Sequence, residues 1–160
     1  MTVKTHKTLQ ICFVLTLLLV MPVLAHDSDN SGWRLVTRVT DGDTIILDGN
    51  EKVRLIGIDT PETVHPKKPV EYFGKQASQF TKNTCEGRLV RLEYDQERVD
   101  KYGRTLAYVY LENGTFLNAE IIKQGYGFAY TQFPFKYMGT FVQYERKARR
   151  GNKGLWGNGD

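Results

Sequence analysis

The stretch that decides the fold is DGDTIILDGNEKVRLIGIDTPET, residues 41–63. It contains two short strand-like runs, 44–47 and 53–58, and residues 48–50 between them have the chemistry of a turn. Acidic residues stand at both ends of the stretch, and a lone arginine, Arg54, lies among apolar neighbours in the second run. Hard oxygen ligands beside one guanidinium group suit a divalent metal that acts on a phosphate.

Further strand patterns lie on both sides of this stretch. Apolar and polar residues alternate over 33–40 and over 90–95, and residues 104–111 form another strand-like run. The pair Asn113-Gly114 is expected to close a hairpin after the last of these strands.

Three segments carry apolar residues at helical spacing, namely 73–84, 118–125 and 137–151. Asn118 is expected to cap the second helix at its start, and Gly125 is expected to end it. Five strands with one helix between the third and the fourth fit a five-stranded Greek-key barrel of the OB type. We therefore predict an α+β fold, mainly β, with three helices.

The ends of the chain differ in character from its middle. Residues 1–25 read as a secretory signal peptide, with a basic start, a short apolar run and Ala25 at the cleavage point. The alternative is an N-terminal anchor that is not cleaved. Residues 26–32 are expected to be a flexible segment, 33–157 a single domain and 158–160 a tail. The expected product is a secreted or periplasmic monomer with no membrane association after cleavage.

Net charge and cysteine content set limits on function. The formal net charge is +4, and the leader holds two of the 22 basic residues and none of the 18 acidic ones, which leaves +2 beyond residue 25. A charge this small does not by itself indicate nucleic-acid binding. Cys12 leaves with the leader, so Cys85 remains alone and is expected to be an apolar helix-end residue.

Acidic residues form the first candidate site. Asp43 follows a glycine in a tight turn, and Asp59 ends a strand just before Thr60-Pro61. Two aspartates, a backbone carbonyl and water make an all-oxygen site, which calcium tolerates better than magnesium does. The alternative is that Asp41 and Asp43 are simply turn residues and that Glu62 is a surface charge.

Basic and aromatic residues form the second candidate group. Guanidinium groups bind phosphate oxygens in pairs, and Arg54 and Arg104 are placed to do so, although structural ion pairs would equally explain them. Residues in predicted loops offer a basic, aromatic rim for a nucleic-acid strand, unless they are only solvated surface residues; they are Lys67, Lys68, Lys101 and Tyr102.

At these residues the chain closely resembles the staphylococcal nuclease (thermonuclease) family. The matching segments are DGDT at 41–44, RLIGIDTPET at 54–63, HPKKPVEYFGKQASQFTK at 65–82, DKYGRTLAYVY at 100–110, KQGYGFAY at 123–130 and GLW at 154–156. The resemblance implies an OB-fold barrel with three helices. It also implies a Ca²⁺-dependent endonuclease that acts on DNA and RNA, cleaves the P–O5′ bond and leaves 3′-phosphate ends.

The resemblance also implies roles for individual residues. By position, the metal ligands are the carboxylates of Asp43 and Asp59 and the carbonyl of Thr60, with Asp41 supporting them. Glu62 matches the residue proposed to position or deprotonate the attacking water. The remaining matches are phosphate-binding residues, Arg54 and Arg104, and nucleotide-contacting residues, Lys101, Tyr102 and Tyr130.

One position departs from the family pattern. Where the family commonly has a second nucleotide-contacting tyrosine, this chain has Gln132, followed by Phe133. Substrate grip or base preference is therefore open. Two alternatives also stay open: a non-catalytic OB module that binds nucleic acid or a protein, and a nuclease that uses a metal other than calcium.

Overall fold

The computed structural model describes residues 32–63 and 69–157. The proposed signal peptide, residues 26–31 of the proposed flexible segment and the tail at 158–160 lie outside the described residues. Lys67 and Lys68 lie outside them as well, so their predicted place in a basic rim is untested.

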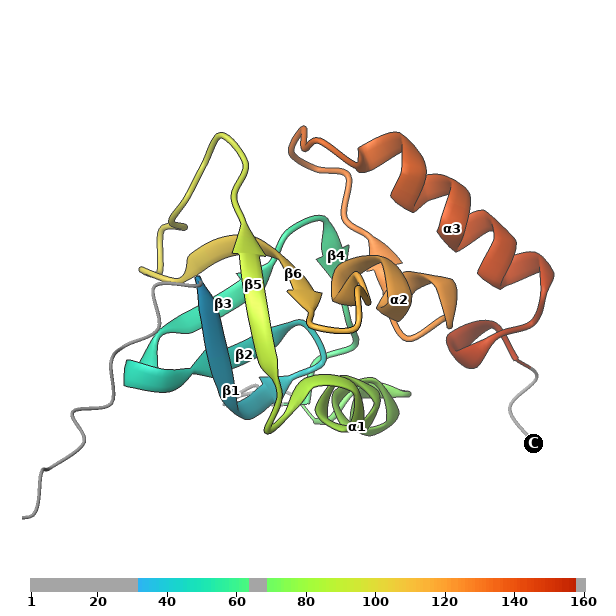
Figure 1. Cartoon of the computed structure of the whole chain (residues 1–160). Helices are drawn as coiled ribbons and strands as arrows, with labels where there is room; N and C mark the ends of the chain where they lie inside the picture. The colour runs from blue at the N-terminus through green and yellow to red at the C-terminus, as the bar shows by residue number, and fades with distance from the viewer. Residues whose placement is uncertain (1–31, 64–68, 158–160) are drawn as a thin grey trace, which may run out of the picture.

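Five strands form a closed barrel (Figure 1). The barrel strands are β1 (Trp33–Asp41), β2 (Thr44–Leu47), β3 (Lys52–Leu55), β5 (Leu89–Glu93) and β6 (Thr105–Leu111). Their order is β1-β2-β3-β6-β5, and the β3–β6 pair is parallel whereas the others are antiparallel. This order confirms the predicted OB barrel, because the third and fifth barrel strands run side by side.

The predicted third strand, 53–58, is wrong as a single element. β3 ends at Leu55, the backbone of Gly57 takes a φ of +75°, and a new strand, β4 (Ile58–Asp59), pairs with β7 (Phe128–Ala129). A side chain at position 57 would also meet the ring of Phe135 at 2.4 Å. The glycine therefore redirects the chain and moves Asp59 off the barrel into a small second sheet.

The three predicted helices are present as α1 (Gly74–Cys85), α2 (Leu117–Lys123) and α3 (Met138–Arg150), with short 3₁₀ turns at Asp48–Asn50 and Gly154–Trp156. α2 lies between the barrel and α3 (Figure 1). Among the described residues, none of the helices is both long and apolar enough to span a membrane.

The prediction that Asn118 caps α2 is wrong. Phe116 occupies the cap position, and Asn118 is fully buried inside the first turn. Its side-chain amide donates to the carbonyls of Ile56 and Ala107, and its oxygen accepts from the N–H of Val109. Asn118 thus ties the helix to the barrel and to the chain after β3, which a local sequence pattern does not reveal.

The core fills the barrel and continues beneath α2 and α3. Fully buried residues include Val36, Ile45, Val53, Val90 and Val109 from the barrel and Ile121, Ile122 and Phe141 from the helices. Cys85 ends α1 with no exposed surface, and burial raises the pKa of its thiol to about 12. This confirms its expected role as an apolar helix-end residue.

Candidate active site

The turn between β1 and β2 delivers two carboxylates to one end of the barrel. Asp41 ends β1, Asp43 precedes β2, and both are buried. Gly42 between them has no room for a side chain, because a Cβ there would lie 2.6 Å from Oγ1 of Thr60. Oγ1 of Thr81, on α1, donates to the Gly42 carbonyl at 2.6 Å. The turn is therefore held from both sides.

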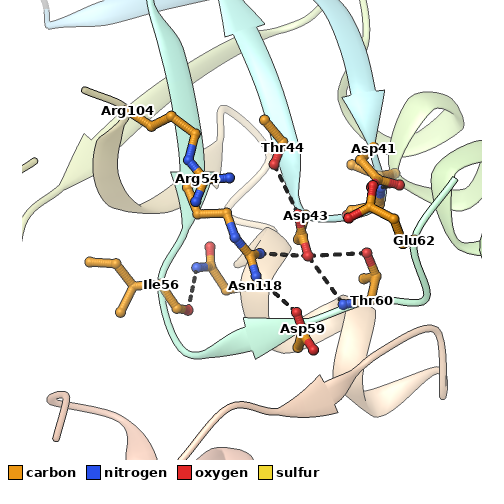
Figure 2. A network of polar contacts seen from close by, with 12 residues as sticks. Asp41, Asp43, Thr44, Arg54, Ile56, Asp59, Thr60, Glu62, Arg104 and Asn118 are labelled. Carbon is orange, nitrogen blue, oxygen red and sulfur yellow. Dashed lines mark hydrogen bonds and ion pairs between the residues drawn. The ribbon is translucent and has the colours of Figure 1, made fainter. Parts of the chain in front are cut away.

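Arg54 joins two of the predicted metal ligands (Figure 2). Its Nη1 lies 2.6 Å from Oδ2 of Asp43, and its Nη2 donates to Oδ1 of Asp59 at 3.0 Å. The contact with Asp43 is an ion pair without hydrogen-bond alignment, and no described atom accepts a hydrogen bond from the buried Nη1. The ion-pair alternative for Arg54 is therefore realised, yet the guanidinium keeps unused donor capacity.

The Asp43 carboxylate is further fixed by threonines. Thr60 donates to Oδ2 through its backbone N–H at 3.1 Å and its hydroxyl at 3.2 Å, and the Thr44 hydroxyl donates to Oδ1 at 2.9 Å. These bonds orient the carboxylate before any ligand arrives, which is the arrangement expected of a preorganised site.

Asp59 is more open than Asp43, and about half of its side chain is exposed. Partial burial raises the pKa of Asp59, the charge of Arg54 opposes that rise, and the charge of Asp43 adds to it. Two carboxylates and one guanidinium leave this part of the site with an excess of negative charge, which favours a cation.

Asp41 and Glu62 form a second acidic pair, and Figure 2 shows them side by side. Oδ1 of Asp41 accepts from the N–H of Gly42 and the hydroxyl of Thr63, both at 2.8 Å. Burial, followed by a hydrogen bond shared with Glu62, raises the pKa of Asp41 to about 6. A nearby carboxylate disfavours the charged form of Asp41, so it adds to the effect of burial on the pKa of Asp41.

Glu71 is a site residue that the sequence reasoning missed. Its carboxylate accepts from the N–H of Glu62 at 3.1 Å, and its own N–H donates to the Glu62 carbonyl at 3.0 Å. The two bonds close the segment that carries Glu62 and fix its backbone. Nine residues separate the pair, so no local pattern reveals the contact.

Arg104 stands immediately before β6, the strand that pairs with β3. Arg54 is in register with Leu106, so Arg104, two residues earlier, faces the same side of the barrel as Arg54. Figure 2 shows both arginines beside this part of the barrel. Arg104 thus lies beside the network of Asp43, Arg54 and Asp59, but among the described residues no ion pair joins Arg104 to that network.

Asp100 holds Arg104 in place and was also missed. Its Oδ2 accepts from Nε of Arg104 at 2.6 Å, and its Oδ1 accepts from the N–H groups of Tyr102 and Arg104. Burial alone would raise the pKa of Asp100, but hydrogen bonds from Arg104 and Tyr102 outweigh burial and lower it. An aspartate just before a glycine turn is a local pattern that sequence reasoning can recognise.

Of the predicted nucleotide-contacting residues, Lys101 and Tyr102 are exposed and Tyr130 is partly exposed. Tyr102 is 71% exposed, and Lys101 and Arg104 lie 5.1 and 5.4 Å from its ring centroid. Tyr130 donates its hydroxyl to Oε1 of Gln132 at 3.0 Å, and its ring lies 6.2 Å from that of Phe133. Gln132, the position that departs from the family pattern, therefore interacts with the tyrosine that is retained.

The donor set fits a hard cation. Asp43, Asp59 and the Thr60 carbonyl offer oxygen atoms only, which is the ligand chemistry of calcium and magnesium. In residues 32–63 and 69–157, no three His, Cys, Asp or Glu side chains form a compact metal-binding group. Arg54 instead bridges Asp43 and Asp59, so the fit rests on donor chemistry and on the excess of negative charge.

Comparison with known proteins identifies the family. The model of the family described as "Staphylococcal nuclease homologue" matches residues 52–158. The chain belongs to the staphylococcal nuclease family. This agrees with the barrel and three helices described above.

Several curated relatives match over most of this chain. It is 46% identical over 127 residues to a Staphylococcus hyicus protein named thermonuclease, covering 77% of this chain and 75% of the relative. It is 49% identical over 126 residues to the thermonuclease of Staphylococcus intermedius, covering 76% and 74%. A Bacillus subtilis protein named endonuclease YhcR is 34% identical over 139 residues, which span 79% of this chain and 11% of that protein.

Proposed function

We propose that this chain is a calcium-dependent endonuclease that hydrolyses phosphodiester bonds of DNA and RNA, breaking the P–O5′ bond and leaving 3′-phosphate ends. A phosphodiester hydrolase is the enzyme class of its family, and its closely matching relatives carry the name thermonuclease. The observation that carries the proposal is the Asp43–Arg54–Asp59 network, with Arg104 on the same face of the adjacent strand.

The calcium ligands in this proposal are the carboxylates of Asp43 and Asp59 and the carbonyl of Thr60, with Asp41 supporting them. When bound, the ion supplies charge that polarises a phosphate oxygen and lowers the pKa of bound water. Asp43 suits the role because three hydrogen bonds already fix its carboxylate. Asp59 suits it because its side chain is accessible from solvent.

Glu62 orients the attacking water and accepts its proton. The role needs a carboxylate held in one position, and the paired bonds with Glu71 fix the backbone of Glu62. The neighbouring Asp41 has a pKa raised to about 6, so it holds a proton more tightly than an ordinary aspartate does. In-line attack on phosphorus then requires the water on the side opposite the 5′ oxygen.

Arg54 and Arg104 bind the phosphate and neutralise the charge that develops on pentacoordinate phosphorus. Donors fixed before the reaction are effective, and each is worth roughly 10²–10³ in rate. Asp100 orients the Arg104 guanidinium through Nε, which leaves the terminal nitrogens for phosphate.

The substrate strand is held by Lys101, Tyr102 and Tyr130. Tyrosine rings provide stacking faces for bases, and such contacts tolerate many sequences. The exposure of Tyr102 and the partial exposure of Tyr130 support this role. We also propose that residues 1–25 are a signal peptide removed after Ala25, and that the mature enzyme acts as a monomer outside the cytoplasm.

Digestion of plasmid DNA tests the proposal. The protein starting at His26 is incubated with plasmid in calcium, in magnesium and in chelator, and the product ends are labelled with and without prior phosphatase treatment. We expect digestion in calcium only, with 3′ ends that accept label only after phosphatase treatment. Intact plasmid in calcium would refute nuclease activity, equal digestion in magnesium would refute the metal, and free 3′-hydroxyl ends would refute the cleaved bond.

A further inference from the structure

The positive charge of this chain is concentrated in one short segment. Between residues 145 and 153 there are five basic residues and one acidic residue, a net charge of +4 that equals the formal net charge of the whole chain. The basic residues are Arg146, Lys147, Arg149, Arg150 and Lys153. All other charges in the chain therefore balance, and nothing in the proposed catalytic site uses this segment.

These side chains are exposed to solvent. α3 buries Phe141 and Ala148, whereas Arg146, Lys147 and Arg150 are exposed. Figure 1 shows α3 as the outer layer, on the side of α2 that is remote from the barrel. We call the exposed group Arg146, Lys147, Arg150 and Lys153, together with Lys123 on α2, the α3 basic surface.

A recess lies within the α3 basic surface, between α2, α3 and the segment that follows α3. It has a volume of about 300 Å³ and is lined by three lysines, with Tyr144 and Glu120 among its other residues; the lysines are Lys123, Lys147 and Lys153. Nζ of Lys123 lies 4.7 Å from the ring centroid of Tyr144 and 3.9 Å from the Glu120 carboxylate. Several ammonium groups around one open recess suit an anion such as a phosphate group.

The surface is fixed relative to the catalytic residues. Arg149 stacks on the ring of Trp156 at 3.7 Å and donates to Glu145 at 2.9 Å. Glu145 in turn accepts from the N–H of Ala129 at 2.8 Å. Ala129 belongs to β7, which pairs with β4, the strand that carries Asp59. A polymer bound on α3 would thus be held at a constant position relative to the site.

We infer that the α3 basic surface binds the phosphate backbone of long nucleic-acid substrates, outside the site of cleavage; this inference rests on the proposed nuclease function. Duplex DNA carries one charge per about 1.7 Å of axis, so its phosphates continue beyond the cleaved bond. A long duplex can therefore contact the catalytic site and the α3 basic surface at once, whereas a dinucleotide can contact only one of them. The surface therefore raises the affinity for polymers without taking part in the chemistry.

The helix dipole offers a competing explanation for part of the cluster. Cations in the last turn of a helix are stabilising, and this accounts for Lys147, Arg149 and Arg150. It also accounts for Lys123, the last residue of α2, but not for Arg146 or for Lys153, which lies beyond the end of α3. If the dipole were the whole reason, neutral substitutions would change stability and leave nucleic-acid binding unchanged.

A triple variant tests the inference: Arg146→Gln, Lys147→Gln and Arg150→Gln. Arg149 is kept because it contacts Glu145 and Trp156, and glutamine preserves helix propensity. Binding of a duplex of about 40 base pairs is measured in chelator over a series of salt concentrations. We expect binding about tenfold weaker than wild type near 0.1 M salt, and a salt slope smaller by about 2–3. Calcium-dependent cleavage of a dinucleotide should be unchanged.

Two matched variants serve as controls. Arg38→Gln, Lys52→Gln and Arg88→Gln remove the same charge from exposed barrel positions and should bind the duplex more tightly than the α3 triple variant. Arg146→Lys with Arg150→Lys keeps the charge and should bind like wild type. Wild-type affinity in the α3 triple variant would overturn the inference, as would an equal loss in the barrel control.

The binding assay also separates this inference from the proposed function. Because binding is measured in chelator, a wild-type protein that cleaves nothing in calcium would refute the nuclease proposal while the binding comparison stays valid. Vesicles with anionic lipid are tested in parallel. If the α3 triple variant lost vesicle binding but kept duplex binding, the surface would be a lipid contact and the inference would be wrong.

Discussion

Nη1 of Arg54 lies 2.6 Å from Oδ2 of Asp43, so the residue proposed to bind phosphate is paired with a residue proposed to bind calcium. The same guanidinium donates to Asp59 at 3.0 Å. Arg54 therefore pairs with both proposed ligand carboxylates and offsets part of their negative charge. Calcium and Arg54 compete for the same negative charge, so removing the charge of Arg54 should change the affinity for calcium in a direction that can be measured.

Arg54→Gln should bind calcium more tightly although it cleaves DNA more slowly. Removing a positive charge within a few ångströms of the ion favours the ion by about fivefold to tenfold. Turnover should fall by about 10²–10³, because a phosphate donor is lost. Calorimetric titration with calcium measures the first effect, and Arg54→Lys, which retains the charge, is the control. Weaker calcium binding by Arg54→Gln would show that the carboxylates do not hold the ion.

Arg104→Lys should lose most of the catalytic contribution of Arg104. Lysine keeps the charge but cannot donate in the paired geometry that a guanidinium offers, so kcat should fall by about 10²–10³. Rates are measured at saturating DNA, where binding defects no longer matter. Arg38→Lys, an exchange of the same kind at an exposed position on β1, is the matched control. Near-full turnover in Arg104→Lys would remove Arg104 from the mechanism.

Asp41 should make the metal-free protein less stable as the pH rises from about 4 to about 6. Burial raises the pKa of Asp41 from its ordinary 3.8 to about 6, so the folded state binds the proton more tightly than the unfolded state does. Stability from this group is present below pH 4 and is lost through pH 6.

Asp41→Asn isolates this effect. Asparagine can still accept from Gly42 and Thr63 and can donate to Glu62, so the variant should lose the part of the slope between pH 4 and 6 that Asp41 contributes and keep the part that comes from Asp59. At pH 7 it should be more stable than wild type by about 1 kcal/mol after allowance for solvent screening. Urea unfolding in chelator at a series of pH values measures both. A wild-type curve that is flat, or that rises, over this interval would be incompatible with the assigned proton.

Asn118 should be one of the most sensitive polar positions in the fold. Asn118→Ala removes the partner of the Val109 N–H and of the Ile56 carbonyl, although the Ala107 carbonyl keeps its bond from the N–H of Ile56, so the free energy of unfolding should fall by about 3 kcal/mol or more. Asn118→Asp keeps the acceptor and loses both donors, which distinguishes the two functions of the amide. Denaturant unfolding of the two variants provides the comparison, and a loss below about 1 kcal/mol in Asn118→Ala would contradict it.

The barrel was predictable because residues 33–40 and 90–95 alternate apolar and polar side chains with period two, and because short strand-like runs separated by turn residues lie between and after them. The break at Gly57 was not, because a glycine in an apolar run fits a strand as well as a turn until Phe135 packs against it. β7 has only two residues and no periodicity of its own. Asn118 fits a helix cap locally, and its burial against the barrel depends on tertiary packing.

The candidate site was likewise predictable from the sequence only in part. The sequence singled out Asp43 in a tight turn and Asp59 at a strand end, and the family resemblance added roles for Asp41 and Glu62; the structure brings all four into one region (Figure 2). It left open whether Arg54 binds phosphate or pairs with aspartates, since both need the same charge. The Glu71 contact with Glu62 joins positions that are nine apart in sequence and share no helix or strand, so no local pattern predicts it.

Calcium-dependent cleavage of duplex DNA by wild type and Asp43→Asn tests the central claim most directly. Asp48→Asn is the matched control, because Asp48 is an exposed aspartate that pairs with Arg34 away from the site. We predict that wild type and Asp48→Asn cleave with saturable calcium dependence, and that Asp43→Asn is slower by at least about 10². Cleavage by Asp43→Asn at the wild-type rate, or cleavage by wild type in chelator, would contradict it.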